Sequence, residues 1–304
     1  MKRIPTLDGW RAIAVLAVIV HHVSKFYCGS EYWWIWRGAV GVDVFFAVSG
    51  LLITSQLLQN GNLKSFYIRR VFRILPPAIV YLTIVLALHL IDSQDFLRCL
   101  AIQRNYTNGS VYSAHFWSLS LEEQFYLVWP PVLLLSGKRA PMVAMAGILA
   151  VCLWRPYALL HLGMGYVRTD LRCDGLLWGC VTAFALRTAN VKFGRILPAV
   201  CFIAAVLVWG IPIFMPILPI LVSITVLGTV QEPHWIMSRL LEWKPLVWIG
   251  QRSYGIYLWQ SFFIMVPINV PMILKVGAAI VWSAVLYRFF ETPLRQVGRR
   301  LALR

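Results

Sequence analysis

Apolar residues recur along the chain in ten runs, each about as long as a bilayer crossing and separated by short polar segments. We place these runs near 8–27, 38–58, 74–91, 117–137, 141–160, 171–187, 195–211, 212–231, 249–268 and 272–290. A helix needs about 20 apolar residues to cross the hydrocarbon core, and lipid cannot satisfy open backbone hydrogen-bonding groups, so the spans should be helices. The pattern predicts an all-α protein, a polytopic transmembrane helix bundle of about ten spans.

The composition agrees with a lipid environment. Of 304 residues, 60% are hydrophobic and 13% are charged. In soluble domains, about 45–50% of the residues are apolar and about 25% are charged. A net charge of +16 would suit nucleic acid in a soluble protein, but basic residues also hold membrane loops in the cytoplasm. We expect membrane lipids and no nucleic acid as partners. Because no cleavage site follows it, the first run is expected to remain as an uncleaved span.

The distribution of basic residues predicts the orientation. With the N-terminus inside, 20 of the 28 Lys and Arg residues fall on the inner side, as the positive-inside rule requires. An even number of spans then places both termini in the cytoplasm. We expect one transmembrane domain over residues 4–295 and a basic cytoplasmic tail over 296–304.

Ionisable residues within the first two runs indicate a site, since such residues in lipid are costly and commonly functional or paired. Arg11 and His22 lie eleven residues apart, close to three helical turns, so they share a face about 16 Å apart. His21 is rotated away from that face. In the second run, Asp43 must pair or be protonated and is a natural partner for an imidazole. The alternatives are a hydrogen-bonded interior His and an Asp that caps a helix.

A basic segment precedes the third run, and we predict that it is a cytoplasmic loop. It carries Arg69, Arg70 and Arg73, which would share one side of a helical turn. Clustered guanidinium groups suit phosphate. The alternative is a patch that sets topology or binds lipid headgroups.

Two further polar groups open later runs. Trp117, Ser118, Glu122 and Glu123 begin the fourth run and predict a polar site near the outer face; a polar helix start at the interface is the alternative. Arg172 and Asp174 open the sixth run as candidate buried charges, with a structural ion pair as the alternative. The chain shows no metal-ligand spacing, so we expect no metal.

Together these segments resemble the membrane acyltransferase-3 family, which includes bacterial polysaccharide O-acetyltransferases. The resemblance covers about residues 4–295 and rests on motifs in the family's order: Arg-x10-His, GVDVFFAVSG, RRxxRIxP, WSLSxEEQFYLxWP, RxDGLLxG, SYGIYLW and a final ExP. In the family, the residues matching Arg11, His22, Arg70 and Arg73 are functional. The chain departs from the family at Gln260, where a His is common, and at Ala78, where a Tyr is common.

The resemblance implies a bacterial inner-membrane enzyme that uses acetyl-CoA, or another acyl-CoA, as a cytoplasmic donor. The acceptor would be a hydroxyl of an extracytoplasmic or lipid-linked glycan, such as a lipopolysaccharide or exopolysaccharide. No SGNH-type domain is recognisable, so any partner activity is expected from elsewhere. The roles that we assign are coenzyme A binding by Arg69, Arg70 and Arg73; catalysis by His22, Arg11, Asp43, Glu122 and Glu123; and acceptor binding by Trp117, Ser118, Arg172 and Asp174.

Within this scheme, His22 either removes the proton of the acceptor hydroxyl or accepts the acyl group itself. The sequence leaves both routes open. The main alternative function is a transporter or flippase of a glycan or lipid-linked substrate, because intramembrane charges and Pro-broken helices also mark transport pathways. A membrane scaffold is a third alternative, but it leaves the buried His, Asp and Glu residues unexplained.

Overall fold

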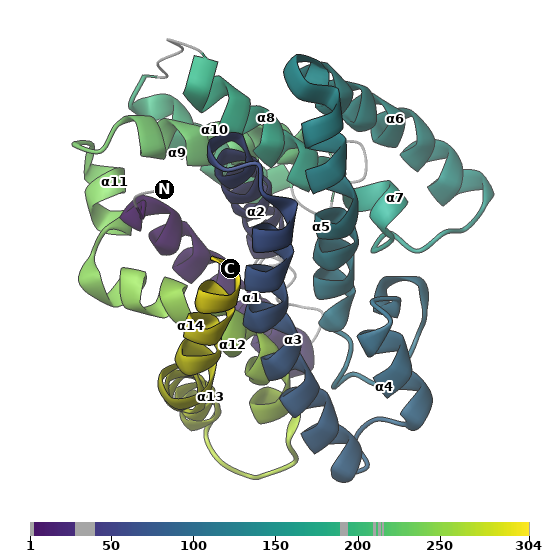
Figure 1. The fold of residues 1–304 in the computed structure, drawn as a ribbon. Coiled ribbons are helices and arrows are strands. Elements are labelled where there is room, and N and C mark those ends of the chain that lie inside the picture. The colour runs from purple at the N-terminus through teal and green to yellow at the C-terminus, as the bar shows by residue number, and fades with distance from the viewer. Residues whose placement is uncertain are drawn as a thin grey trace. The chain divides into compact units, whose positions relative to one another are not determined.

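The computed structural model describes residues 3–27, 40–188, 194–208, 211, 214 and 216–303, and their regular structure is helical throughout, without strands (Figure 1). The prediction of an all-α fold is confirmed. The α-helices are α1 (Pro5–Tyr27), α2 (Val40–Gln59), α3 (Leu63–Ala87), α4 (Ser93–Leu100), α5 (Phe116–Ser136), α6 (Ala140–His161), α7 (Thr169–Arg172), α8 (Asp174–Thr188), α9 (Ile196–Val208), α10 (Leu218–Gln231), α11 (Ile236–Leu241), α12 (Lys244–Met265), α13 (Met272–Leu286) and α14 (Thr292–Leu301). A π-helical turn, Tyr287–Glu291, joins α13 to α14.

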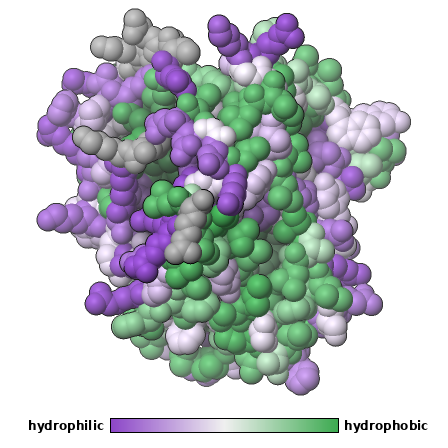
Figure 2. Space-filling model, viewed as in Figure 1, coloured by the Kyte–Doolittle hydropathy of each residue, from purple (hydrophilic) through white to green (hydrophobic). Residues whose placement is uncertain are grey.

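Each of the ten predicted runs contains one of these helices, although the ends differ by several residues. Within the described residues, five stretches are long and apolar enough to cross a membrane, judged by length and composition. They are Pro5–Lys25, Val40–Gln59, Leu63–Ala87, Phe116–His161, which comprises α5 and α6, and Met272–Leu301. Apolar side chains also cover much of the face shown in Figure 2. The count of ten spans stays a prediction.

The chain divides into two compact units, which we describe separately. Unit 1 comprises Met1–Asn60 and Phe125–Gln251, and unit 2 comprises Gly61–Gln124 and Arg252–Arg304. Each unit therefore combines stretches that lie far apart in the sequence.

Glycines let the helices of unit 1 approach closely. A Cβ on Gly41 would overlap the Ala14 carbonyl oxygen of α1, and a Cβ on Gly50 would overlap the Leu176 carbonyl oxygen of α8. Gly179 of α8 faces the Ala47 carbonyl in the same way. Small residues commonly allow such close contact between membrane helices, so the glycines of the GVDVFFAVSG and RxDGLLxG motifs serve packing.

The same contacts give the directions of the helices in unit 1. In the core cluster that α1 shares with α2, the fully buried residues of α1 are Leu7, Trp10 and Ala14, all from its first half. Since Gly41 at the start of α2 packs on Ala14, α2 runs antiparallel along that half. Phe46 faces Gly175, and Gly50 faces Leu176 and Cys180, so α2 and α8 run parallel.

Unit 2 corrects the prediction of a basic loop. α3 begins at Leu63, eleven residues before the predicted span, because the Asn62 side chain caps it by accepting a hydrogen bond from the Ser65 amide at 2.8 Å. The arginines at 69, 70 and 73 therefore lie on α3. Arginine is a good helix former but lowers hydropathy, so an apolar run misses this part of the helix.

The end of the chain is also helical. α14 continues to Leu301 and includes most of the segment that we predicted as a tail. It packs against α3, where Gly298 lies on the Phe72 side chain. The rest of unit 2 is centred on Tyr81 and Leu82 of α3 with Leu258 of α12.

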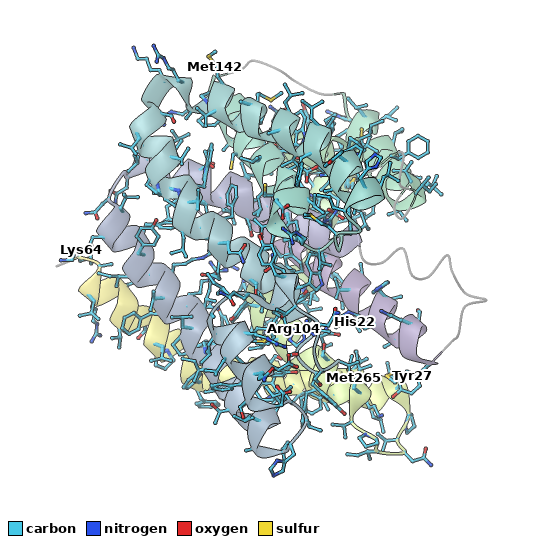
Figure 3. The ribbon with its side chains drawn as sticks, turned by 90° about the vertical axis from the view of Figure 1, so that its right-hand side faces the viewer. His22, Tyr27, Lys64, Arg104, Met142 and Met265 are labelled. Atoms are coloured by element: carbon cyan, nitrogen blue, oxygen red, sulfur yellow. The ribbon has the colours of Figure 1, made fainter. Side chains whose placement is uncertain are left out.

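The polar segment before α5 is ordered by buried charge. It contains α4, and Arg104 donates from Nε to the Ser113 hydroxyl at 3.1 Å and lies 4.0 Å from Asp95. Tyr112 Oη donates to the Met265 carbonyl at 3.2 Å, which ties this segment to the end of α12. Figure 3 accordingly shows Arg104 and Met265 away from Lys64, which lies at the start of α3.

Candidate functional site

Arg11 and His22 lie on one uninterrupted helix, α1. Their separation of eleven residues therefore corresponds to about 16 Å along the helix axis. Both side chains are half-buried. The ring centroids of His21 and His22 are 5.5 Å apart, and Figure 3 places His22 near the end of α1 that Tyr27 marks.

Asp43 is 1% exposed and forms an ion pair with Arg172, in which Oδ1 lies 2.7 Å from Nη2. Arg172 also donates to the Tyr166 hydroxyl at 2.6 Å and stacks over its ring at 4.6 Å. Because Gly41 packs on Ala14, the start of α2 lies about 12 Å along α1 from His22. The Asp43 carboxylate thus pairs with Arg172. That Asp43 also orients the His22 ring stays a prediction.

Asp174 pairs with Arg155 of α6 and not with its neighbour Arg172. Arg155 is buried and donates from Nε to the Leu171 carbonyl at 2.8 Å. Arg155 was not among the candidate residues predicted from the sequence, and the structure places it inside the apolar helix α6. An arginine within an apolar run is the signal that would have identified it.

These side chains form one electrically neutral group, the unit 1 charge cluster. Its members are Asp43, Arg155, Tyr166, Arg172 and Asp174. They come from α2, α6, α7, α8 and the segment before α7. Buried charges are tolerated only when they are paired, so the cluster fixes the positions of these helix ends relative to one another within unit 1.

Unit 2 holds a second charged group, in which Arg70 Nε lies 3.7 Å from Glu123 Oε1, with side chains 16% and 19% exposed. We predicted these residues at opposite faces of the membrane. The structure brings them together because α3 starts early and carries Arg70 about 10 Å into the helix. Arg69 donates to Ser65 Oγ at 2.5 Å, while Arg73 and Glu122 are half-buried.

Tyr254 of α12 lies among the charges of unit 2. Its hydroxyl donates to the Ile74 carbonyl of α3 at 2.8 Å, and the next residue, Gly255, faces the Glu291 carboxylate. Glu291 is buried and pairs with Arg295 at 2.5 Å. Tyr254, the Arg70–Glu123 pair and the Glu291–Arg295 pair form the unit 2 charge cluster. The candidate residues predicted from the sequence included none from the SYGIYLW and ExP segments, so this role was missed.

The structure gives Ser118 a packing role in unit 2. Its hydroxyl lies 2.6 Å from Tyr257 Oη, and Tyr257 donates to the His115 carbonyl at 3.3 Å. Ser118 is buried, and Trp117 is half-buried. Acceptor binding by these two residues stays a prediction.

No metal-binding group is evident in the part of the chain that the structure describes, and its free cysteines include three that are buried. No group of three or more His, Cys, Asp or Glu side chains there is placed to hold a metal ion. Cys99, Cys180 and Cys201 are free and buried, and burial raises the pKa of Cys99, on α4, to about 12. Since the thiolate is the nucleophile, this shift makes the Cys99 thiol less reactive.

Comparison with known proteins gives one family and several relatives. A family model described as an acyltransferase domain matches residues 4–287. The chain is 30% identical to a peptidoglycan O-acetyltransferase of Listeria monocytogenes, over 98% of this chain and 56% of that protein. It is 31% identical to a putative peptidoglycan O-acetyltransferase of Bacillus subtilis, over 98% of this chain and 56% of that protein. It is also 31% identical to a putative O-acetyltransferase of Staphylococcus aureus, over 98% of this chain and 58% of that protein.

The chain thus spans little more than half the length of these relatives, 56% to 58%. No solved structure matched the chain.

Proposed function

Because the chain belongs to the acyltransferase family whose model covers residues 4–287, we propose that it is a membrane O-acyltransferase. It moves an acyl group, acetyl in particular, from cytoplasmic acyl-CoA to a hydroxyl of an extracytoplasmic or lipid-linked glycan. Relatives named for peptidoglycan O-acetylation support acetyl as the group and a cell-envelope glycan as the acceptor. The bacterial inner membrane is the corresponding location.

The observation that carries this proposal is the set of arginines on α3. Arg69, Arg70 and Arg73 lie within two turns of a capped helix, so the helix holds their guanidinium groups on neighbouring positions. Coenzyme A carries three phosphate groups, and arginine binds phosphate through charge-assisted, often bidentate hydrogen bonds. We assign the coenzyme A head to this face of α3.

The acyl transfer itself is assigned to His22. Its imidazole removes the proton of the acceptor hydroxyl while the oxygen attacks the thioester carbonyl. The C–S bond then breaks, and coenzyme A leaves as a thiol after its sulfur takes the proton from the His22 imidazolium. An acyl-imidazole route, in which His22 is the nucleophile, requires the same side chain. Arg11, which lies on the same helix as His22, would stabilise charge during this step. Catalytic roles for Glu122 and Glu123 stay predictions.

We also propose ten spans with both termini in the cytoplasm. The helix directions within unit 1 support this order, because α2 and α8 are the second and sixth predicted spans and run parallel. The basic bias of 20 to 8 supports the orientation.

Cysteine labelling should confirm this topology. Single cysteines at Lys138 and Lys244 should be labelled only after the cells are permeabilised, whereas a cysteine at Asn108 should react in intact cells. All three side chains are exposed. Labelling of position 138 from outside would reverse the orientation.

The donor assignment is tested with the purified full chain, acetyl-CoA and a glycan acceptor. Arg70→Ala should raise the donor KM about tenfold or more, because the loss of one charge-assisted contact costs about 1.5–3 kcal/mol. The acceptor KM should change little. The measurement is the rate of acetyl transfer over a range of acetyl-CoA concentrations.

Glu123→Gln provides the control, because it removes the ion-pair partner and keeps the Arg70 guanidinium. If Arg70 binds donor phosphate, this variant should keep or lower the donor KM. If Arg70 serves only to hold Glu123, both variants should lower stability alike and leave the donor KM unchanged, which would remove α3 from the donor site.

A further inference from the structure

α14 packs against α3, the helix to which we assign the donor phosphates. This helix, yellow in Figure 1, spans Thr292–Leu301 and contacts α3 along its length. The contact is close at Gly298, where an added Cβ would come within 2.6 Å of the Phe72 Cβ. The backbone of α14 therefore lies directly beside the turn of α3 that carries Arg69 and Arg73.

Helix geometry determines which arginines of α14 lie on the side of the α3 cluster. Viewed down the axis of α14, the positions of Arg295 and Arg299 are rotated from that of Gly298 by about 60° and about 100° in the same direction. The Tyr254 hydroxyl donates to the Ile74 carbonyl of α3, one turn from Arg70, and the next residue, Gly255, faces the Glu291 carboxylate that pairs with Arg295. The Arg295 side of α14 is therefore the side on which Arg70 lies. Arg299, one turn from Arg295, lies on that side as well.

Arg300 occupies the opposite face. It follows Gly298 by about 200°, so its side chain points away from α3. Arg299 and Arg300 are both exposed. The two neighbours thus carry the same charge on the same helix and differ in the direction that they face.

The charges along this contact leave an excess of positive charge. Arg70 is paired with Glu123, and Arg295 is paired with Glu291. With Arg69, Arg73 and Arg299, five guanidinium groups lie along this contact, against the three carboxylates Glu122, Glu123 and Glu291. Like charges gathered in this way repel one another, and a bound polyanion compensates the repulsion.

We propose that α14 completes the phosphate site of α3, and that Arg299 binds a phosphate group of the acyl-CoA donor. This inference rests on the proposed function. Arg295 is a positioning residue, since its ion pair with Glu291 fixes the start of α14. The shared chemistry is a phosphate ester, which a lipid headgroup also offers, so the experiment separates the two sources.

The test measures coenzyme A binding to the purified full chain in lipid nanodiscs made only of phosphatidylcholine. Arg299→Gln should weaken binding about tenfold, and Arg300→Gln should leave it within about twofold of the unchanged chain. Arg299→Lys should weaken binding less than Arg299→Gln, because it keeps the charge. Both positions are exposed, so the thermal unfolding midpoint should be the same in all variants.

A second arm uses nanodiscs that also contain phosphatidylglycerol. If Arg299→Gln changes activity only in these nanodiscs and leaves coenzyme A binding intact, the phosphate belongs to lipid and the proposal is wrong. Equal effects of Arg299→Gln and Arg300→Gln would also overturn it. If the unchanged chain binds no coenzyme A at all, the donor assignment of the proposed function fails instead.

Discussion

Replacement of His22 by Ala should abolish acetyl transfer while the protein still inserts and folds. A general base or nucleophile contributes on the order of 10²–10⁴-fold in rate, so activity should fall at least that far. His22 is half-buried near the end of α1, and removal of its ring leaves the helix intact. Glycan acetylation would be measured by mass spectrometry at matched protein levels.

His21→Ala is the matched control, because it removes the same ring from the adjacent position. The two side chains point about 100° apart on α1, and only His22 shares a face with Arg11. His21→Ala should therefore keep most of the activity. If the two variants were equally active, the face shared by Arg11 and His22 would be structural, and the proposed mechanism would be wrong.

The sequence predicted the helices well where apolar residues dominate and poorly where they do not. Each of the ten predicted runs contains a helix, because burial in lipid demands one continuous apolar segment. The first turns of α3 and all of α14 were missed. Both contain arginines that lower hydropathy, and both are held by tertiary contacts such as Gly298 on Phe72.

The charged residues were recognised, but their partners were not. Asp43 and Arg172 lie 129 residues apart in the sequence, and only the packing of α2 on α8 brings them together. Arg70 and Glu123 were placed at opposite faces because the length of α3 was unknown. Hydropathy indicates that a charge in an apolar run needs a partner, whereas the choice of partner depends on helix packing.

The residues of the motifs have two physical roles, close helix packing and ion pairing, which cannot be told apart from the sequence of the motifs alone. Gly41, Gly50 and Gly179 allow close helix contacts, while Asp43, Arg172 and Asp174 form ion pairs at the ends of the same helices. RxDGLLxG thus combines the charge cluster and the packing surface of unit 1. Its contribution to acceptor binding is separable only by variants that remove charge without changing packing.

Arg172→Leu should strongly destabilise the protein. Arg172 is 4% exposed and Asp43 is 1% exposed, so the variant buries the carboxylate without the opposing charge of Arg172. Removal of one partner of a buried ion pair costs about 3–5 kcal/mol. The thermal unfolding midpoint in detergent and the yield of monodisperse protein would measure the loss.

Removal of both charges separates stability from function. Asp43→Leu with Arg172→Leu should recover much of the lost stability, since replacement of a buried ion pair by apolar groups is often neutral or stabilising. Arg168→Leu is the control, because its ion pair with Asp170 is about one-third exposed, with side chains at 31% and 33%. Such pairs contribute about 0–1 kcal/mol, so its midpoint should barely change.

Activity of the double variant then decides what the ion pair does. If the ion pair only holds α2 and α7 together, the folded double variant should acetylate glycan at a rate near that of the unchanged protein. If the double variant folds but is inactive, the charges themselves act in the reaction, as we predicted for Asp43 in catalysis and for Arg172 in acceptor binding. A double variant no more stable than Arg172→Leu would mean that Asp43 depends on other partners, and the ion pair would not be what fixes this end of α2.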